Sequence, residues 1–136
     1  MNEQLIKRVV ELTNIERRKA SLPALKYDPV LAAAAQKHSV DMAMQDYFDH
    51  EGSDGSSVSE RVSAMGYKWS FVAENLQGGG DTPEEAVQRL MNSPGHRKNI
   101  LNPKAQEIGV GYYFLAKDTG DVKHKHYWTQ VFAKPA

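Results

Sequence analysis

The chain has 136 residues, of which 40% are hydrophobic and 25% are charged, and its 17 basic residues balance its 17 acidic residues. These values are typical of a globular protein, and the length predicts a single domain over residues 1–136. The balanced charge excludes the basic footprint of a nucleic-acid-binding protein, and the absence of cysteine excludes disulfides, thiolate metal sites and a cysteine nucleophile.

Two helices are predicted in the first third of the chain. Apolar residues recur at helical spacing over residues 3–20, which indicates an amphipathic helix. A second helix is predicted over residues 28–46, because Asp28 is a favourable N-cap and Pro29 suits the first helical position. The run of four alanines in this helix lets another element approach closely. His38 lies near its apolar face, and we interpret it as a partly buried packing residue.

A turn-rich segment, residues 46–57, follows the second helix and carries His50. The two aromatic residues before His50 predict that this loop is anchored to the core. Ser57 and Glu60 then form a capping box, which begins a short helix. Gly66 is expected to end that helix after residue 65.

Glu74 lies in an apolar part of the segment YKWSFVAENLQGGG, residues 67–80. A buried carboxylate needs a partner, because without one it would take up a proton. The partner is either a set of backbone amides, which would make Glu74 structural, or a bound ligand. The three glycines at residues 78–80 predict an irregular, exposed loop.

The stretch NSPGHRKNILN, residues 92–102, combines helix-start and helix-stop signals around one histidine. It follows a helix that begins at a capping box at Thr82. Ser93 can cap the next helix and Pro94 suits its first position, which places His96 in the first turn. Such a histidine is either surface decoration or part of a site, and residues elsewhere must decide.

The C-terminal third has the character of strands. Residues 107–116 and 124–133 are rich in β-branched and aromatic residues. The turn signal at residues 118–121 predicts that they pair as an antiparallel hairpin. His124 and His126 alternate on the second strand, a spacing that can seat a metal ion, but their polar neighbours indicate a solvated strand end. Helices early and strands late predict an α+β layered fold.

His50, His96 and Glu74 are the residues of this chain best suited to form a site together. They make an N/N/O set that can hold a divalent ion such as zinc and leave one position open for water. They lie about twenty residues apart, so spacing alone does not identify the site. The chain lacks the metalloprotease motif H-E-x-x-H, a nucleophile elbow, a P-loop and a dinucleotide fingerprint.

Five fragments, in this order, resemble the bacterial branch of the CAP superfamily, which comprises cysteine-rich secretory proteins, antigen 5 and pathogenesis-related 1 proteins and is also called SCP-like. The resemblance covers residues 5–132 and implies a three-layer α-β-α sandwich with a central, mainly antiparallel sheet, usually in an exported protein. The fragments are Asp49-His50, AENL (73–76), SPGHRKNIL (93–101), EIGVG (107–111) and YWTQVFA (127–133).

The resemblance also implies a central cleft lined by two histidines and two acidic residues, in which zinc or another divalent ion binds. His50 matches the first histidine, His96 the second, and Glu74 one of the acids. Ser93, or Asn92 if the alignment slips by one residue, stands where the second acid would be, and neither is a carboxylate. The alignment does not place Glu107 at this position.

Three functions follow from the resemblance. The first is a secreted binding module whose partner is a lipid, a glycan, or a host or cell-envelope molecule, and which holds a divalent ion. The second is a metal-assisted hydrolase with Glu74 as general base, and the third is a structural protein of the cell envelope or spore. We favour the first, because one glutamate would otherwise have to serve as both ligand and base.

The same resemblance implies an extracellular or cell-envelope location, and we expect a monomer without a nucleic-acid partner. No apolar run in the chain is long enough to span a bilayer. The first ten residues lack the apolar core of an export signal. We therefore expect either a cytosolic protein or one whose export signal has been removed, and export is an expectation from the resemblance alone.

Overall fold

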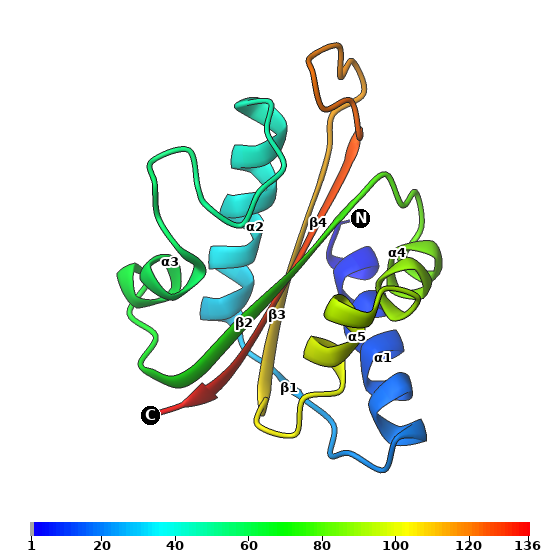
Figure 1. Ribbon diagram of the computed structural model, residues 1–136, viewed down its shortest axis with the longest axis vertical. Coiled ribbons are helices and arrows are strands. Elements are labelled where there is room, and N and C mark those ends of the chain that lie inside the picture. The colour runs from blue at the N-terminus through cyan, green and yellow to red at the C-terminus, as the bar shows by residue number, and fades with distance from the viewer. Residues whose placement is uncertain (1) are drawn as a thin grey trace.

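A four-stranded sheet lies between two layers of helices in the computed structural model, which describes residues 2–136 (Figure 1). Helices α2 and α3 cover one face, and α1, α4 and α5 cover the other. The elements are α1 (Asn2–Lys19), β1 (Lys26–Tyr27), α2 (Pro29–Met44), α3 (Val58–Ala64), β2 (Trp69–Gly78), α4 (Pro83–Met91), α5 (Pro94–Ile100), β3 (Glu107–Phe114) and β4 (His126–Pro135).

The strand order is β1-β3-β4-β2. Strand β4 pairs antiparallel with both β3 and β2, and only the two-residue β1 pairs parallel, with β3. The predicted three-layer α-β-α sandwich with a mainly antiparallel sheet is therefore confirmed. None of the helices described over residues 2–136 has the length and apolar character needed to cross a bilayer.

The helix starts follow the capping signals in the sequence. The Asp28 carboxylate accepts hydrogen bonds from two backbone amides of α2, at 3.0 and 2.9 Å. Ser57 and Glu60 form the reciprocal capping box of α3, and the Thr82 hydroxyl accepts from a backbone amide of α4. Helix α2 ends at Met44, two residues earlier than predicted.

Helix α2 packs unusually close to the sheet. A Cβ atom added at Gly109 of β3 would overlap the backbone of Leu31 and Ala32, and one at Gly111 would overlap that of Ala35. The predicted close approach of the alanine-rich helix is thus confirmed, and glycine on the facing strand makes it possible. This packing buries His38 of α2, which is 1% exposed.

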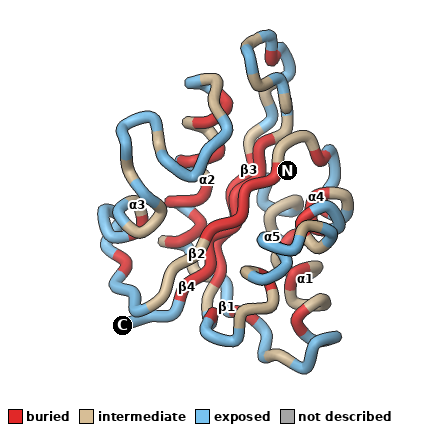
Figure 2. Tube along the Cα trace, viewed as in Figure 1, coloured by how far each residue is buried: buried red, intermediate tan, exposed pale blue. Residues whose placement is uncertain are grey.

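The core is divided by the sheet into clusters on its two faces. Figure 2 shows the middle of the strands as the buried centre of the molecule. The cluster under α1, α4 and α5 includes Val9, Leu90 and Phe132, and the cluster under α2 and α3 includes Leu31 and Val62. Strand β2 separates the two helical layers at the point where the candidate site residues lie.

Two predictions, one about a loop and one about a strand end, are wrong. The glycine segment is not an exposed loop: Gly78 belongs to β2, and Gly80 is buried, with its carbonyl accepting a hydrogen bond from the Trp128 indole at 2.6 Å. His124 and His126 do not alternate on a solvated strand, since β4 begins at His126. His124 packs on Gly78, and His126 Nδ1 lies 2.7 Å from the hydroxyl of a core tyrosine.

Candidate functional site

Glu74 projects a carboxylate from the edge strand β2 into a nearly closed environment, with 1% of its side chain exposed. One oxygen accepts a hydrogen bond from His50 Nδ1 at 2.9 Å, and the other accepts from Arg61 Nη2 of α3 at 2.7 Å. The Arg61 side chain is 11% exposed. The buried charge of Glu74 is therefore compensated by the largely buried guanidinium of Arg61 and by a histidine, which is how a protein tolerates a buried carboxylate.

Three hydrogen bonds fix the position of His50 and its loop, although 57% of the His50 side chain is exposed. Besides the Glu74 contact, its own carbonyl accepts a hydrogen bond from Arg61 Nη1 at 2.8 Å. The carbonyl of Asp49 lies 2.8 Å from Nε2 of the buried His38, which donates to it. The Glu74 hydrogen bond raises the pKa of His50, while burial lowers the pKa of His38. His38 is therefore a packing residue, as predicted, and it also fixes the loop of His50.

His96 lies in the first turn of α5, and its Nδ1 is 2.9 Å from the Ser93 hydroxyl. Ser93 is the N-cap residue of α5, but its side chain makes no capping hydrogen bond. The predicted cap is thus replaced by a contact that orients His96. Burial and, to a smaller extent, the positive charge of His50 lower the pKa of His96.

A buried network of amide side chains supports both halves of the site. Asn75, which is fully buried, donates from Nδ2 to the His96 carbonyl at 3.0 Å and to Gln130 Oε1 at 3.1 Å. Asn99 of α5 donates to the Glu74 carbonyl at 3.2 Å and to Asn75 Oδ1 at 2.8 Å. The network ties α5 to β2 and so fixes where His96 stands relative to Glu74.

Sequence reasoning missed this network and the role of Arg61. The available signal was the density of polar residues in strands that the fold buries, since Asn75, Gln77, Thr129 and Gln130 are all buried. Buried polar groups must find hydrogen-bond partners, and no buried side-chain nitrogen or oxygen lacks one in the described chain. The partners of Asn75, Thr129 and Gln130 lie on other elements and cannot be identified from spacing.

The structure brings the three predicted ligands into one region but does not preassemble them around one point. Within residues 2–136, no three histidine, aspartate or glutamate side chains are arranged to hold a metal ion. Glu74 has both oxygens engaged by protein groups. Glu107 contacts none of the three predicted ligands through a hydrogen bond; its carboxylate accepts one from the Tyr67 hydroxyl at 2.6 Å.

The two imidazoles share an arrangement that suits ligand binding. His50 and His96 each have Nδ1 in contact with a neighbouring side chain, Glu74 and Ser93 respectively. In neither is Nε2 hydrogen-bonded to another described residue. When Nδ1 donates its proton to such a neighbour, the neutral ring carries its lone pair on Nε2. Metal-binding histidines are commonly oriented in this way.

A family model and two proteins of Bacillus subtilis match most of this chain in sequence. The model of the family described as "CAP: Cysteine-rich secretory protein family" matches residues 10–132. Protein YkwD of Bacillus subtilis (strain 168) is 43% identical over 126 residues, which are 93% of this chain and 46% of YkwD. Membrane protein YlbC of the same organism is 31% identical over 128 residues, which are 94% of this chain and 34% of YlbC. The chain thus spans less than half of either relative.

Two solved structures superpose on almost the whole of this chain. An extracellular protein containing an SCP domain from Bacillus anthracis str. Ames superposes with a TM-score of 0.84 at 29% identity, over 97% of this chain and 41% of that protein. An outer surface protein of Borrelia burgdorferi superposes with a TM-score of 0.88 at 18% identity, over 100% of this chain and 96% of that one, which shows a shared fold. The sequence match and the fold together establish that this chain belongs to the CAP family of cysteine-rich secretory proteins.

Proposed function

We propose that this chain is an extracellular CAP-domain binding module that holds a divalent metal ion, such as zinc, through Nε2 of His50 and of His96. One observation carries the proposal: both rings have Nδ1 engaged by a neighbouring side chain and Nε2 free of hydrogen bonds to the described residues. Imidazole nitrogen is a preferred zinc donor. Water or a ligand of the module would complete the coordination of the ion.

In this proposal Glu74 and Ser93 orient the two histidines. A carboxylate that accepts the Nδ1 proton of a ligating histidine fixes the tautomer and increases the basicity of the ring. Both Glu74 oxygens accept hydrogen bonds, from His50 at 2.9 Å and from Arg61 at 2.7 Å, which favours the orienting role over direct coordination. A hydroxyl at Ser93 orients His96 without adding charge, so the site is less acidic than the four-residue set of the family.

The binding function is favoured over a metal-assisted hydrolase for an electrostatic reason. A general base must be free to accept a proton, whereas Glu74 is paired with the largely buried guanidinium of Arg61 and with His50. An ion held by two imidazoles can position a ligand without a base beside it. The extracellular location is supported by the extracellular SCP-domain protein of Bacillus anthracis. The ligand is proposed to be a lipid, a glycan or another molecule of the host or cell envelope.

Isothermal titration with zinc at about pH 7.5, where free imidazoles are largely neutral, tests the metal site. We expect saturable binding to the wild-type chain and its loss in His50→Ala and in His96→Ala. His124→Ala is the matched control, because His124 lies outside the site and packs on Gly78. Unchanged zinc binding in the double variant of His50 and His96 would refute the assignment.

Glu74→Gln separates an orienting role from a ligand role. Loss of a partner that orients a ligating histidine typically changes metal affinity by about 10- to 100-fold, so we expect measurable but weakened binding. Complete loss, equal to that in His50→Ala, would instead make Glu74 a ligand. The lipid or glycan partner is tested separately, by mass spectrometry of molecules that copurify with the secreted chain.

A further inference from the structure

A cavity of about 420 Å³ is lined in part by Arg61 but not by Glu74. Its walls are α2, the loop of residues 52–56 and α3, which stand together on one face of the sheet in Figure 1. A volume of this size is within the range of small-molecule sites in proteins. His38 and Arg61 line it, whereas His50, Glu74 and His96 do not. The cavity is therefore adjacent to the proposed metal site and separate from it.

The walls of the cavity are mainly apolar. The side chains of Ala34 and Ala64 are small, which leaves the space between α2 and α3 unfilled. Met44 and Met65 line the cavity and are 57% and 40% exposed, so their flexible thioether chains stand where the cavity meets solvent. Exposed methionines adapt to ligands of different shapes. This lining favours an apolar molecule.

The charged side chains in the walls of the cavity, except one, make hydrogen bonds to other residues. The carboxylates of Asp41, Asp54 and Glu60 each accept hydrogen bonds from the loop or from a helix cap. Arg61 donates to Glu74 and to two backbone carbonyls. The hydrogen bonds from Ser56 and, to a smaller extent, the charge of the exposed Lys37 lower the pKa of Asp54. Lys37 is the one charged residue in the described lining that makes no side-chain hydrogen bond to another described residue.

These groups specify the class of ligand. Two cations face three carboxylates in the walls, so the surroundings offer a ligand anion no net attraction. A ligand cation would find carboxylates that are already hydrogen-bonded. An uncharged molecule with an apolar body and a carbonyl or ester oxygen meets neither obstacle, since the oxygen can accept a hydrogen bond from the Lys37 ammonium.

We infer that the cavity between α2 and α3 is a second ligand site, which binds a neutral apolar molecule whose carbonyl or ester oxygen accepts from Lys37. The site is coupled to the first, because Arg61 and His38 form part of its wall and also hold the backbone of Asp49 and His50. A molecule in the cavity therefore contacts the residues that position His50.

The test uses Prodan, a neutral naphthalene ketone whose fluorescence shifts to the blue in apolar surroundings. We expect saturable binding to the folded chain, with affinity about tenfold or more weaker in Ala64→Phe, which fills the cavity. Lys37→Met should weaken binding roughly two- to tenfold, the effect of one net hydrogen bond. Met44→Gln, at a half-exposed position where the fold tolerates change, should weaken binding as well.

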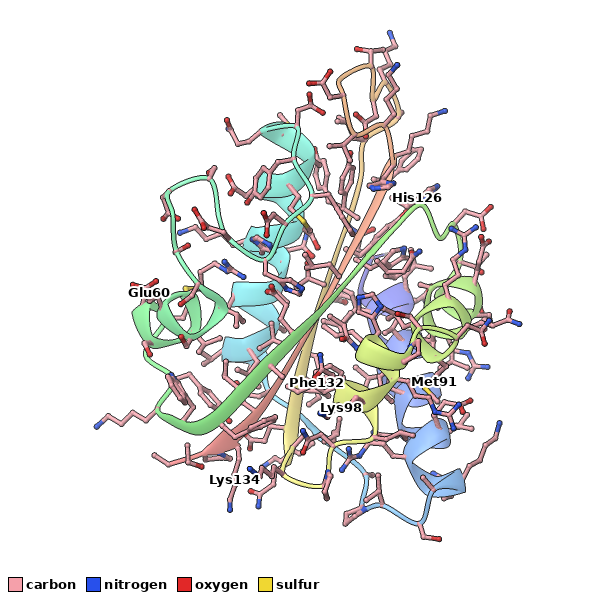
Figure 3. The ribbon with its side chains drawn as sticks, in the orientation of Figure 1. Glu60, Met91, Lys98, His126, Phe132 and Lys134 are labelled. Atoms are coloured by element: carbon pink, nitrogen blue, oxygen red, sulfur yellow. The ribbon has the colours of Figure 1, made fainter. Side chains whose placement is uncertain are left out.

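Met91→Phe is the matched control. Met91 lines a different cavity, of about 340 Å³ between α1, α4 and α5, and Figure 3 shows it on the opposite side of the sheet from Glu60 of α3. Prodan binding should be unchanged in this variant. Loss in Met91→Phe with no change in Ala64→Phe, or no saturable binding to the wild-type chain, would overturn the inference.

Two further measurements separate this site from the metal site and test the ligand class. Prodan should shift the ring signals of His50 in NMR spectra and leave those of His124 in place, and it should still bind to His50→Ala, which lacks the proposed metal site. An anionic naphthalene sulfonate that displaced Prodan with equal affinity would overturn the assignment to neutral ligands. Unchanged Prodan affinity in Lys37→Met would overturn the role of Lys37.

Discussion

Replacing Arg61 with methionine tests whether the buried ion pair holds the site together. The change removes the 2.7 Å contact with Glu74 and two hydrogen bonds, to the carbonyls of His50 and Ser56 at 2.8 and 2.9 Å. The Glu74 side chain is 1% exposed, so water cannot replace the guanidinium without local opening. The variant leaves a buried carboxylate whose remaining side-chain partner is His50.

The expected loss of stability is about 3 kcal/mol. Removing one partner of a buried ion pair costs about 3–5 kcal/mol, and the lower end applies because Arg61 is partly accessible and His50 still donates to Glu74. In the double variant Arg61→Met, Glu74→Gln, no charge is left uncompensated. We therefore expect this variant to be more stable than Arg61→Met alone, as coupling between contacting residues predicts.

Urea unfolding at neutral pH, followed by circular dichroism, measures these differences. Arg8→Met is the matched control, because Arg8 pairs with Glu84 at 2.9 Å but both side chains are well exposed, at 43% and 58%. An exposed pair contributes about 0–1 kcal/mol. The reasoning is refuted if Arg61→Met loses no more stability than Arg8→Met, or if the double variant is the less stable of the two Arg61 variants.

Three further predictions concern the site and its support. Because Glu74 raises the pKa of His50, the contact stabilises the fold fully below the unfolded pKa of histidine. This stabilisation fades as pH rises through the folded value, which NMR titration of His50 measures; a pKa at or below about 6.5 would contradict this. Asn75→Ala leaves buried partners unsatisfied, at about 1–3 kcal/mol each, and should weaken zinc binding; a variant as stable as wild type in urea would count against the network. Gly109→Ala, which overlaps α2, should cost about 1–3 kcal/mol by overpacking, and an unchanged melting temperature would disprove it.

Much of the helical layer could be predicted from local sequence. Asp28, Ser57 and Thr82 cap the helices that the sequence assigns to them, because a cap depends on a side chain and the amides two or three residues away. The resemblance to the CAP family correctly implied the sandwich. Strand β2 gives no alternating signal, since residues 74–77 are buried in succession between the two helical layers. Burial on both faces removes the alternation by which strands are identified.

The candidate site could be predicted only in part. The sequence assigns His50 and Glu74 to the same site, and the structure places them 2.9 Å apart. Arg61 is absent from that prediction. It lies on a short helix rich in polar residues, and nothing in its local sequence indicates that its side chain is largely buried. Ser93 is predicted to cap α5, yet its hydroxyl contacts His96. A serine hydroxyl can cap a helix or contact a nearby side chain, and the position of the His96 ring decides which contact Ser93 makes.

The sequence by itself determined where helices begin, which residues are candidate metal ligands, and the absence of cysteine chemistry. These properties depend on residue types and on neighbours within a few positions. The tertiary structure alone decided that Arg61 holds one oxygen of Glu74 and that Asn75 ties α5 to the sheet. Those contacts join segments 13 and 21 residues apart, so they depend on how the layers pack. Because of that packing, both oxygens of Glu74 are hydrogen-bonded, and one of them contacts His50 Nδ1.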